Sequence, residues 1–182
     1  MEDSCTTRRM IFLILTSSIL VARWGIGMPG KPTPTPTPTP MEIAKTVLER
    51  VADIVCPDNP NSSVSATDTE CHFWCMPAGG HYTAATLQWF GNQNDAGAAF
   101  ESQREGRQVL EFHDFPLLVW GEDHPSFPGG QQESKVWLWQ AHQWLVVVHS
   151  FDDTHFTVAP DPGTVSRILY QVGVEYGLFP AE

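Results

Sequence analysis

The side chains best suited to covalent or metal chemistry are three cysteines and two histidines gathered in one stretch of the chain. They are Cys56, Cys71, His72, Cys75 and His81. Thiolates and imidazoles are good zinc ligands, but the spacing C-x14-C-H-x2-C lacks the paired C-x2-C knuckles of structural zinc sites. We therefore predict no metal site and no cofactor in this protein.

The same cysteines predict a disulfide. In an oxidising compartment Cys56 is expected to pair with Cys71 or Cys75. Closing a loop of about fifteen residues stabilises a fold by about 3 kcal/mol in the chain-entropy model. The third cysteine is then left free or forms a cross-link to another chain. A nucleophilic pair of Cys71 or Cys75 with a distant histidine is a minor alternative.

Aromatic side chains supply the candidate binding residues. A predicted hairpin places three tryptophans on one face with two valines, and it is apolar on the other face as well. Either both faces are buried in a core, which is the favoured interpretation, or the tryptophan face meets a ligand, a partner or a second subunit. Tryptophan rings stack on sugars and prolines and are common in binding hot spots. The candidate binding residues are Trp120, Trp137, Trp139 and Trp144.

Evidence for catalysis is weak. Carboxylates cluster at Glu122-Asp123 and at Asp152-Asp153, and glycosidases use two such groups, but helix or turn capping is the favoured interpretation of both clusters. The seven histidines are scattered, without an H-E-x-x-H or H-x-H pair. The nucleophile elbow, the P-loop and the dinucleotide-binding fingerprint are also missing from the sequence. We assign no catalytic residues and favour a protein that is not an enzyme.

The N-terminal region predicts export. Arg8 and Arg9 precede an apolar run from Met10 to Ala22, whose helical length of about 20 Å is shorter than the hydrocarbon core of a bilayer. This pattern predicts a signal peptide over residues 1–27, or an uncleaved signal anchor. Residues 28–40 include the repeat PTPTPTPTP. It favours a semi-rigid polyproline II rod about 28 Å long, which serves as a linker.

Residues 41–182 are predicted to form a single globular domain of class α+β. Periodicity and capping residues give the element order α-β-α-β-β-β-α, with an antiparallel sheet of about four strands and helices packed against it. Asp58 to Asp68 and Glu122 to Gln132 have the composition of loops. The predicted helices span Met41–Val55, Asn92 or Asn94 to Glu105, and the segment from Asp161 to Gly177, and the predicted strands are His81–Phe90, Phe115–Gly121, Lys135–Gln140 and Gln143–Phe151.

The hairpin formed by the last two predicted strands has a defined register if Ala141-His142 is a two-residue turn. Trp139 then lies opposite Trp144, and Trp137 lies opposite Val146. One face carries the three tryptophans with Val146 and Val148. The other face carries Val136, Leu138, Leu145, Val147 and Phe151.

Composition restricts the partners. The chain has 21 acidic and 10 basic residues and a formal net charge of −11. Such a surface repels phosphate backbones and anionic lipid headgroups. We therefore expect no nucleic-acid partner, and no membrane contact beyond a possible N-terminal anchor.

A resemblance to known domains bears on the location of this protein. The Pro-Thr stalk, the hairpin with Trp139-Gln140 before its turn and Trp144 after it, and the Ser150–Asp153 stretch before a last helix resemble bacterial secreted or cell-surface α+β domains of unknown activity. The resemblance covers roughly residues 80 to 180 and implies a secreted or cell-surface location. We expect a stalk-displayed domain that binds an unidentified ligand or protein. The alternatives are an exported hydrolase that uses carboxylates or a cysteine, and a structural surface module without a ligand.

Overall fold

The computed structural model describes residues 37–59, 62–76, 82–124, 132–153 and 161–181. The predicted signal and most of the predicted linker lie outside these residues. The described residues from Pro38 onward belong to one compact unit, Pro38–Glu182. It is an α+β fold in which helices pack on an antiparallel sheet, as the sequence predicted in outline.

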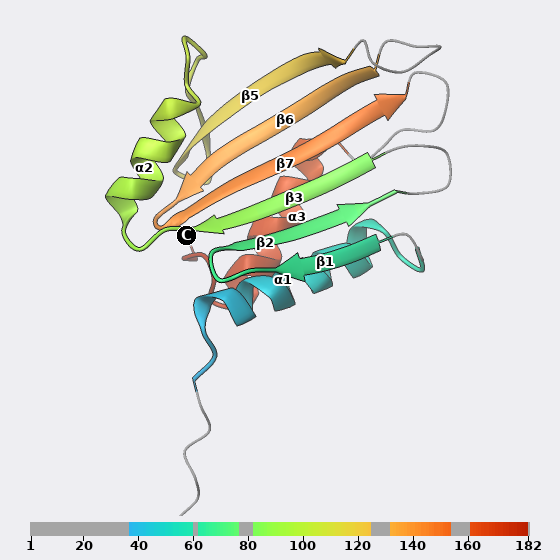
Figure 1. Cartoon of the computed structure of the whole chain (residues 1–182), viewed down its shortest axis with the longest axis vertical. Helices are drawn as coiled ribbons and strands as arrows, with labels where there is room; N and C mark the ends of the chain where they lie inside the picture. The colour runs from blue at the N-terminus through green and yellow to red at the C-terminus, as the bar shows by residue number, and fades with distance from the viewer. Residues whose placement is uncertain (1–36, 60–61, 77–81, 125–131, 154–160, 182) are drawn as a thin grey trace, which may run out of the picture. The chain divides into compact units, whose positions relative to one another are not determined.

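The sheet is larger than predicted, with seven strands instead of about four. Their order across the sheet is β1-β2-β3-β7-β6-β5-β4, and every neighbouring pair is antiparallel (Figure 1). The strands are β1 (Ser62–Ala66), β2 (Glu70–Cys75), β3 (Tyr82–Trp89), β4 (Leu110–Phe112), β5 (Phe115–His124), β6 (Gln132–Ala141) and β7 (Trp144–Asp153).

Three helices divide the sheet into a covered and a partly open face. Helices α1 (Pro40–Val55) and α3 (Pro162–Glu175) contact each other and pack on one face, which we call the covered face. Helix α2 (Gln93–Ser102) packs on the opposite face, against β6 and β7. We call this opposite face the open face, because the side chains on its β1–β3 part are exposed or half-buried. Figure 1 shows the three helices and the sheet.

Local signals fix the ends of the helices. Thr39, the last threonine of the Pro-Thr repeat, is the N-cap of α1, and Pro40 is its first residue. The Thr39 hydroxyl accepts the backbone N–H of Glu42 at 3.2 Å, and the Glu42 carboxylate accepts the backbone N–H of Thr39 at 2.7 Å. This capping box begins the helix one residue earlier than predicted. Asn92, one of the two predicted caps, caps α2, and Asp161 caps α3 as expected. Helix α2 ends at Ser102, earlier than the predicted Glu105.

Three strands were missed in the sequence. The segment assigned to a loop contains β1, whose SSVSA sequence has turn-like composition, and β2 and β4 were not assigned at all. Their pairing in the sheet overrides weak local preferences: β1 is a short polar edge strand on β2, and β4 pairs with β5 through three residues. The predicted loop from Glu122 to Gln132 is also wrong at its ends, because the ladder of β5 and β6 extends to the pair of His124 and Gln132.

The hairpin of β6 and β7 has a different register from the predicted one. Its turn is His142-Gln143, so Trp139 pairs with Val146 and Trp137 with Val148. His142 has φ +52°, and histidine enters this left-handed region more readily than alanine does. The predicted division of the two faces nevertheless holds, because the change moves each partner by two positions and side chains alternate with a period of two.

The main core lies between the covered face and helices α1 and α3. Trp139, Phe73 and Leu48 are among its largest fully buried side chains. Gly163 and Gly173 of α3 allow close approach: a Cβ on Gly163 would lie 2.6 Å from the ring of Trp137, and one on Gly173 would overlap the ring of Phe179. A smaller core under α2 contains Phe100, Leu118, Leu138 and Leu145.

Helix α3 ends earlier than its predicted stripe. Tyr176 was expected in the apolar stripe, but it is the C-cap residue and 45% of its surface is exposed. Gly177 follows with φ +72°, a conformation that favours glycine after a helix. None of the helices in the described residues has the length and apolar character needed to cross a bilayer.

Candidate functional site

The four candidate tryptophans occupy different environments. Trp139 is fully buried and Trp144 is 6% exposed, both on the covered face, so burial favours the core role for these two. Trp137 lies on the same face, half-buried against Gly163. Trp120 lies on the open face, and its ring is 4.6 Å from the guanidinium carbon of Arg107. None of these four is among the exposed large apolar side chains of the described residues.

A different tryptophan is exposed. Trp74 of β2 is 37% exposed and lies on the open face. Its neighbours in register are Ser63 of β1 and Ala84 of β3, both small. Small neighbours leave the indole ring accessible above the sheet. Sequence reasoning missed this residue because β2 was not assigned as a strand. In β2, Cys71, Phe73 and Cys75 alternate with residues of the opposite face. This period of two was the sequence signal that could have identified the strand and the face on which Trp74 lies.

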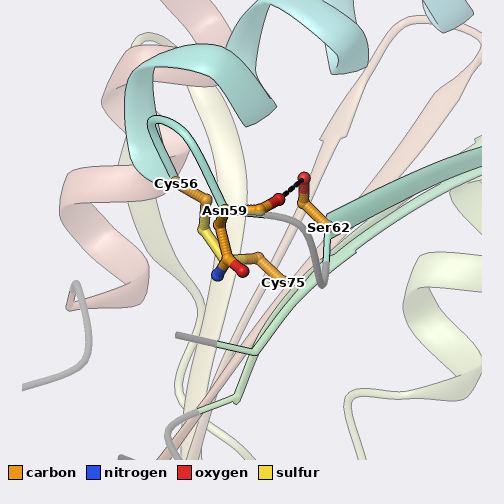
Figure 2. The surroundings of a disulfide bond; sticks show 4 residues. All are labelled: Cys56, Asn59, Ser62 and Cys75. Carbon is orange, nitrogen blue, oxygen red and sulfur yellow. Dashed lines mark hydrogen bonds between the residues drawn. A yellow bond between two sulfur atoms is a disulfide. The ribbon is translucent and has the colours of Figure 1, made fainter. Parts of the chain in front are cut away.

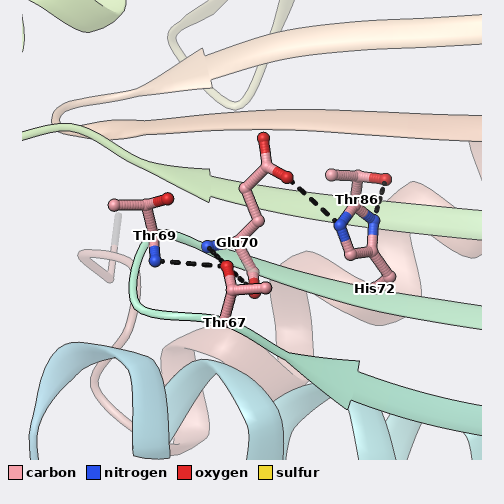
Figure 3. Close-up of polar contacts among 5 residues, drawn as sticks. All are labelled: Thr67, Thr69, Glu70, His72 and Thr86. Carbon is pink, nitrogen blue, oxygen red and sulfur yellow. Dashed lines mark hydrogen bonds and ion pairs between the residues drawn. The ribbon is translucent and has the colours of Figure 1, made fainter.

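A hydrogen-bonded polar group lies beside Trp74 on the same face. His72 Nε2 is 3.2 Å from Glu70 Oε2, and His72 Nδ1 is 3.1 Å from Thr86 Oγ1 (Figure 3). Glu70 and His72 alternate along β2 with Trp74, and Thr86 is the register partner of His72 on β3. The side chains of His72 and Glu70 remain 41% and 36% exposed, so this group is open to solvent.

Together these residues form what we call the open-face patch. It combines one flat aromatic ring with a carboxylate, an imidazole and hydroxyl groups. The backbone around it is held by its own turn: the Thr67 hydroxyl accepts the backbone N–H of Glu70 at 3.0 Å and of Thr69 at 3.4 Å (Figure 3). The patch comprises Ser63, Ser65, Glu70, His72, Trp74, Ala84 and Thr86.

The disulfide lies directly behind this patch. Cys56, at the end of α1, is bonded to Cys75 of β2, which selects one of the two predicted pairings (Figure 2). The Asn59 amide donates to Cys75 Sγ at 3.4 Å, and the Ser62 hydroxyl donates to the Asn59 carbonyl at 3.0 Å. The bond therefore ties α1 and the start of β1 to the strand that carries Trp74.

The remaining cysteine is buried on the covered face. Cys71 is fully buried beneath α1, and its thiol is 3.7 Å from the carbonyl of Met41. Burial raises the pKa of this thiol above its ordinary value. The alternation along β2 places His72 on the opposite face, away from Cys71. Among the described residues, no group of three or more potential metal ligands is found.

The strand segments that contain the two predicted carboxylate clusters lie at the same end of the sheet. The register pairs Asp123 with Glu133, and Glu133 with Asp152, across β5, β6 and β7. Adjacent strands are about 4.8 Å apart, so the backbones of Asp123 and Asp152 are about 10 Å apart. The sequence could not show this, since the two clusters are far apart along the chain.

A small pocket opens at the opposite end of those strands. It lies beside the β4–β5 turn and the β6–β7 turn, and its volume is about 280 Å³. We call it the turn pocket. His113 stacks on Tyr170, with ring centroids 4.0 Å apart, and Phe115 lies 6.0 Å from His142 edge to face. The lining residues are His113, Asp114, Phe115, His142, Tyr170, Pro180 and Ala181.

Both turns at this pocket contain left-handed residues other than glycine. The φ angles are +50° at His113, +59° at Asp114 and +52° at His142. Histidine and aspartate tolerate this region better than most residues, yet glycine or asparagine is the usual choice for such turns. The chain therefore places two imidazoles and a carboxylate at positions where smaller residues would fit the backbone more easily.

Comparisons with known proteins give no family. No family model matches the chain, and no curated protein matches it. One solved structure, of a protein from Bacteroides thetaiotaomicron VPI-5482, is similar with a TM-score of 0.42 and 8% sequence identity. The match covers 58% of this chain and 40% of that protein. We infer neither the fold nor the function of this chain from that likeness.

Proposed function

We propose that this protein is an extracytoplasmic, stalk-displayed domain that binds a neutral glycan at the open-face patch and performs no catalysis. The observation that carries the proposal is Trp74, a flat aromatic side chain that is 37% exposed on a sheet face and flanked by Ser63 and Ala84. Aromatic rings in such a position stack on the apolar faces of sugar rings.

The polar group beside Trp74 favours a glycan over a proline-rich peptide. The Glu70 carboxylate only accepts hydrogen bonds, and proline-rich segments offer few N–H donors to it. Sugar hydroxyls both donate and accept, so they match Glu70, His72 and Thr86 together. The net charge of −11 disfavours anionic glycans. A neutral oligosaccharide therefore fits both the stacking ring and the charge of the protein.

The extracytoplasmic setting is supported by the disulfide. A Cys56–Cys75 bond is typical of oxidising compartments. The Pro-Thr repeat runs directly into α1, with Thr39 as its N-cap and Pro40 as its first residue, so the described end of the linker is continuous with the folded domain. Export by the N-terminal signal and display on a stalk complete the proposal.

Binding of neutral oligosaccharides to the full chain, measured by titration calorimetry, tests this function. The probes are β-1,4- and α-1,4-linked neutral hexasaccharides, with a (Pro-Thr)4-Pro peptide as the competing class. We expect one of the hexasaccharides to bind, and Trp74→Ala to weaken that binding tenfold or more, about 1.4 kcal/mol. Trp74→Phe keeps a stacking ring and retains most of the affinity.

The matched control is Tyr176→Ala, which removes another exposed aromatic ring at the end of α3, away from the patch. It is expected to leave affinity unchanged. Glycan binding that survives Trp74→Ala, or binding of the peptide alone, would contradict the proposal.

A further inference from the structure

The turn pocket is a second concave site, separate from the open-face patch and outside the proposed glycan function. Its walls combine aromatic surface with one carboxylate. Phe115 supplies a half-buried ring, and its centroid lies 6.2 Å from that of Tyr170, inclined by 65°. Tyr170 is only 6% exposed, and His113 stacks on it within the same wall. Asp114 follows His113 in the β4–β5 turn and is exposed at the pocket.

One wall of the pocket is fixed by a hydrogen bond. The Tyr170 hydroxyl donates to the carbonyl of Pro180 at 3.1 Å, which holds the segment after α3 against the ring. Tyr170 also stacks on Phe179, with ring planes inclined by 13°. The pocket is therefore built from packed groups and a short carbonyl-bearing segment, rather than from side chains that extend freely into solvent.

The charge of the pocket favours a cation. None of the described residues that line it is a lysine or an arginine. Aromatic faces attract cations through their quadrupole, and a nearby carboxylate adds direct attraction. The protein as a whole is strongly acidic, with a net charge of −11, which raises the local concentration of cations at its surface.

The size of the pocket limits the ligand. A volume of about 280 Å³ lies just below the usual range for sites that bind drug-sized molecules. A small alkylammonium group fits such a space. A metal ion is a poorer fit, since the described residues contain no cluster of three potential ligands. We propose that the turn pocket binds a small organic cation of the alkylammonium class through Phe115 and Asp114, with the buried Tyr170 ring closing one wall.

Choline and its neutral isostere 3,3-dimethylbutan-1-ol are the probes that test this proposal. The two molecules have the same shape and differ in a single positive charge. Titration of the full chain, followed by NMR chemical shifts, should show choline binding at least fivefold tighter than the alcohol. Shifts should be centred on Asp114, Phe115 and Tyr170.

Two variants with a matched control locate the site. Asp114→Asn removes the charge but tolerates the left-handed turn, and should weaken choline binding about threefold to fivefold. Phe115→Leu removes a ring and should weaken it by a similar factor. The control is Asp58→Asn, at another exposed aspartate with a positive φ, +57°, and it should leave choline affinity unchanged.

Each other outcome overturns the proposal. Equal binding of choline and the alcohol would show an apolar site without charge preference. No binding of choline, or binding unaffected by Asp114→Asn and Phe115→Leu, would remove the cation site. Zinc binding that shifts His113 and His142 and excludes choline would assign the pocket to a metal instead.

Discussion

The two faces of the sheet use the same residue types for different purposes. Within β2, Phe73 on the covered face is 1% exposed, and the next residue, Trp74 on the open face, is 37% exposed. Trp139 on the covered face is fully buried, in contact with Phe179 and other aromatic rings. Trp74 has Ser63 and Ala84 beside it instead.

The difference shows that the position of the helices, rather than the aromatic character of a strand, decides which tryptophan is exposed to solvent. Helices α1 and α3 turn the tryptophans of the β6–β7 hairpin into core. The β1–β3 part of the open face keeps a lone tryptophan with polar neighbours. We therefore expect that substitutions at neighbouring residues of β2 will affect either ligand binding or the stability of the fold, but not both.

The largest expected effect is the difference in stability between substitutions of Phe73 and of Trp74. Phe73→Ala removes a fully buried ring and should lower the free energy of unfolding by about 3–5 kcal/mol. Trp74→Ala removes an exposed ring and should change it by less than about 1 kcal/mol. Urea denaturation of both variants measures the contrast. Equal losses would mean that Trp74 is part of the core, and the distinction between the faces would fail.

The disulfide behind the open-face patch should have the next largest effect. The double variant Cys56→Ala/Cys75→Ala releases a link across 19 positions of sequence and should lower stability by about 3 kcal/mol. The open-face patch should also lose order, since Cys75 adjoins Trp74. The single variant Cys71→Ala serves as control for loss of a thiol on the same strand, and denaturation under non-reducing conditions compares them.

The close packing of α3 on the covered face predicts a smaller effect. Gly173→Ala places a Cβ within the ring of Phe179 and should destabilise the fold by about 1–2 kcal/mol, despite the better helix propensity of alanine. Gly91→Ala is the control, because no atom lies within 4 Å of its added Cβ. Thermal denaturation that ranks the two variants equally would show that α3 is not held this closely.

The smallest effect concerns pH and Cys71. Burial raises the pKa of this thiol in the folded state above its ordinary value of 9.0, so the unfolded chain loses the proton first as the pH rises. The contribution of the neutral thiol to stability is complete below its ordinary pKa of 9.0 and is lost as the pH rises through the raised pKa of the folded state. Stability should decline less steeply above pH 9 in Cys71→Ala. Identical pH profiles would contradict burial of the thiol.

Local sequence signals were sufficient for the helices and for the faces of the hairpin. The caps at Asn92 and Asp161, and the alternation from Trp137 to Val148, act through neighbouring residues and need no knowledge of the rest of the fold. The strands β1, β2 and β4 were missed because their pairing partners lie elsewhere in the chain.

The candidate site was missed for the same reason. Trp74 becomes significant only when Ser63 and Ala84 are known to be its neighbours across β1 and β3. The turn pocket brings together Asp114, His142 and Tyr170 from three separate segments. Such contacts depend on tertiary packing, which residue spacing does not encode directly. The disulfide was limited to two pairings by composition, and the strand register selected Cys75.

Acrylamide quenching of tryptophan fluorescence tests the central claim most directly, that Trp74 on the open face is the most exposed tryptophan of the described residues. The full chain is compared with its Trp74→Phe and Trp139→Phe variants, all in a Trp24→Phe background, so that the emission comes from tryptophans of the described residues. The account predicts that Trp74→Phe removes most of the readily quenched emission and that Trp139→Phe leaves it intact. Unchanged quenching in Trp74→Phe, or its loss in Trp139→Phe, would contradict the account.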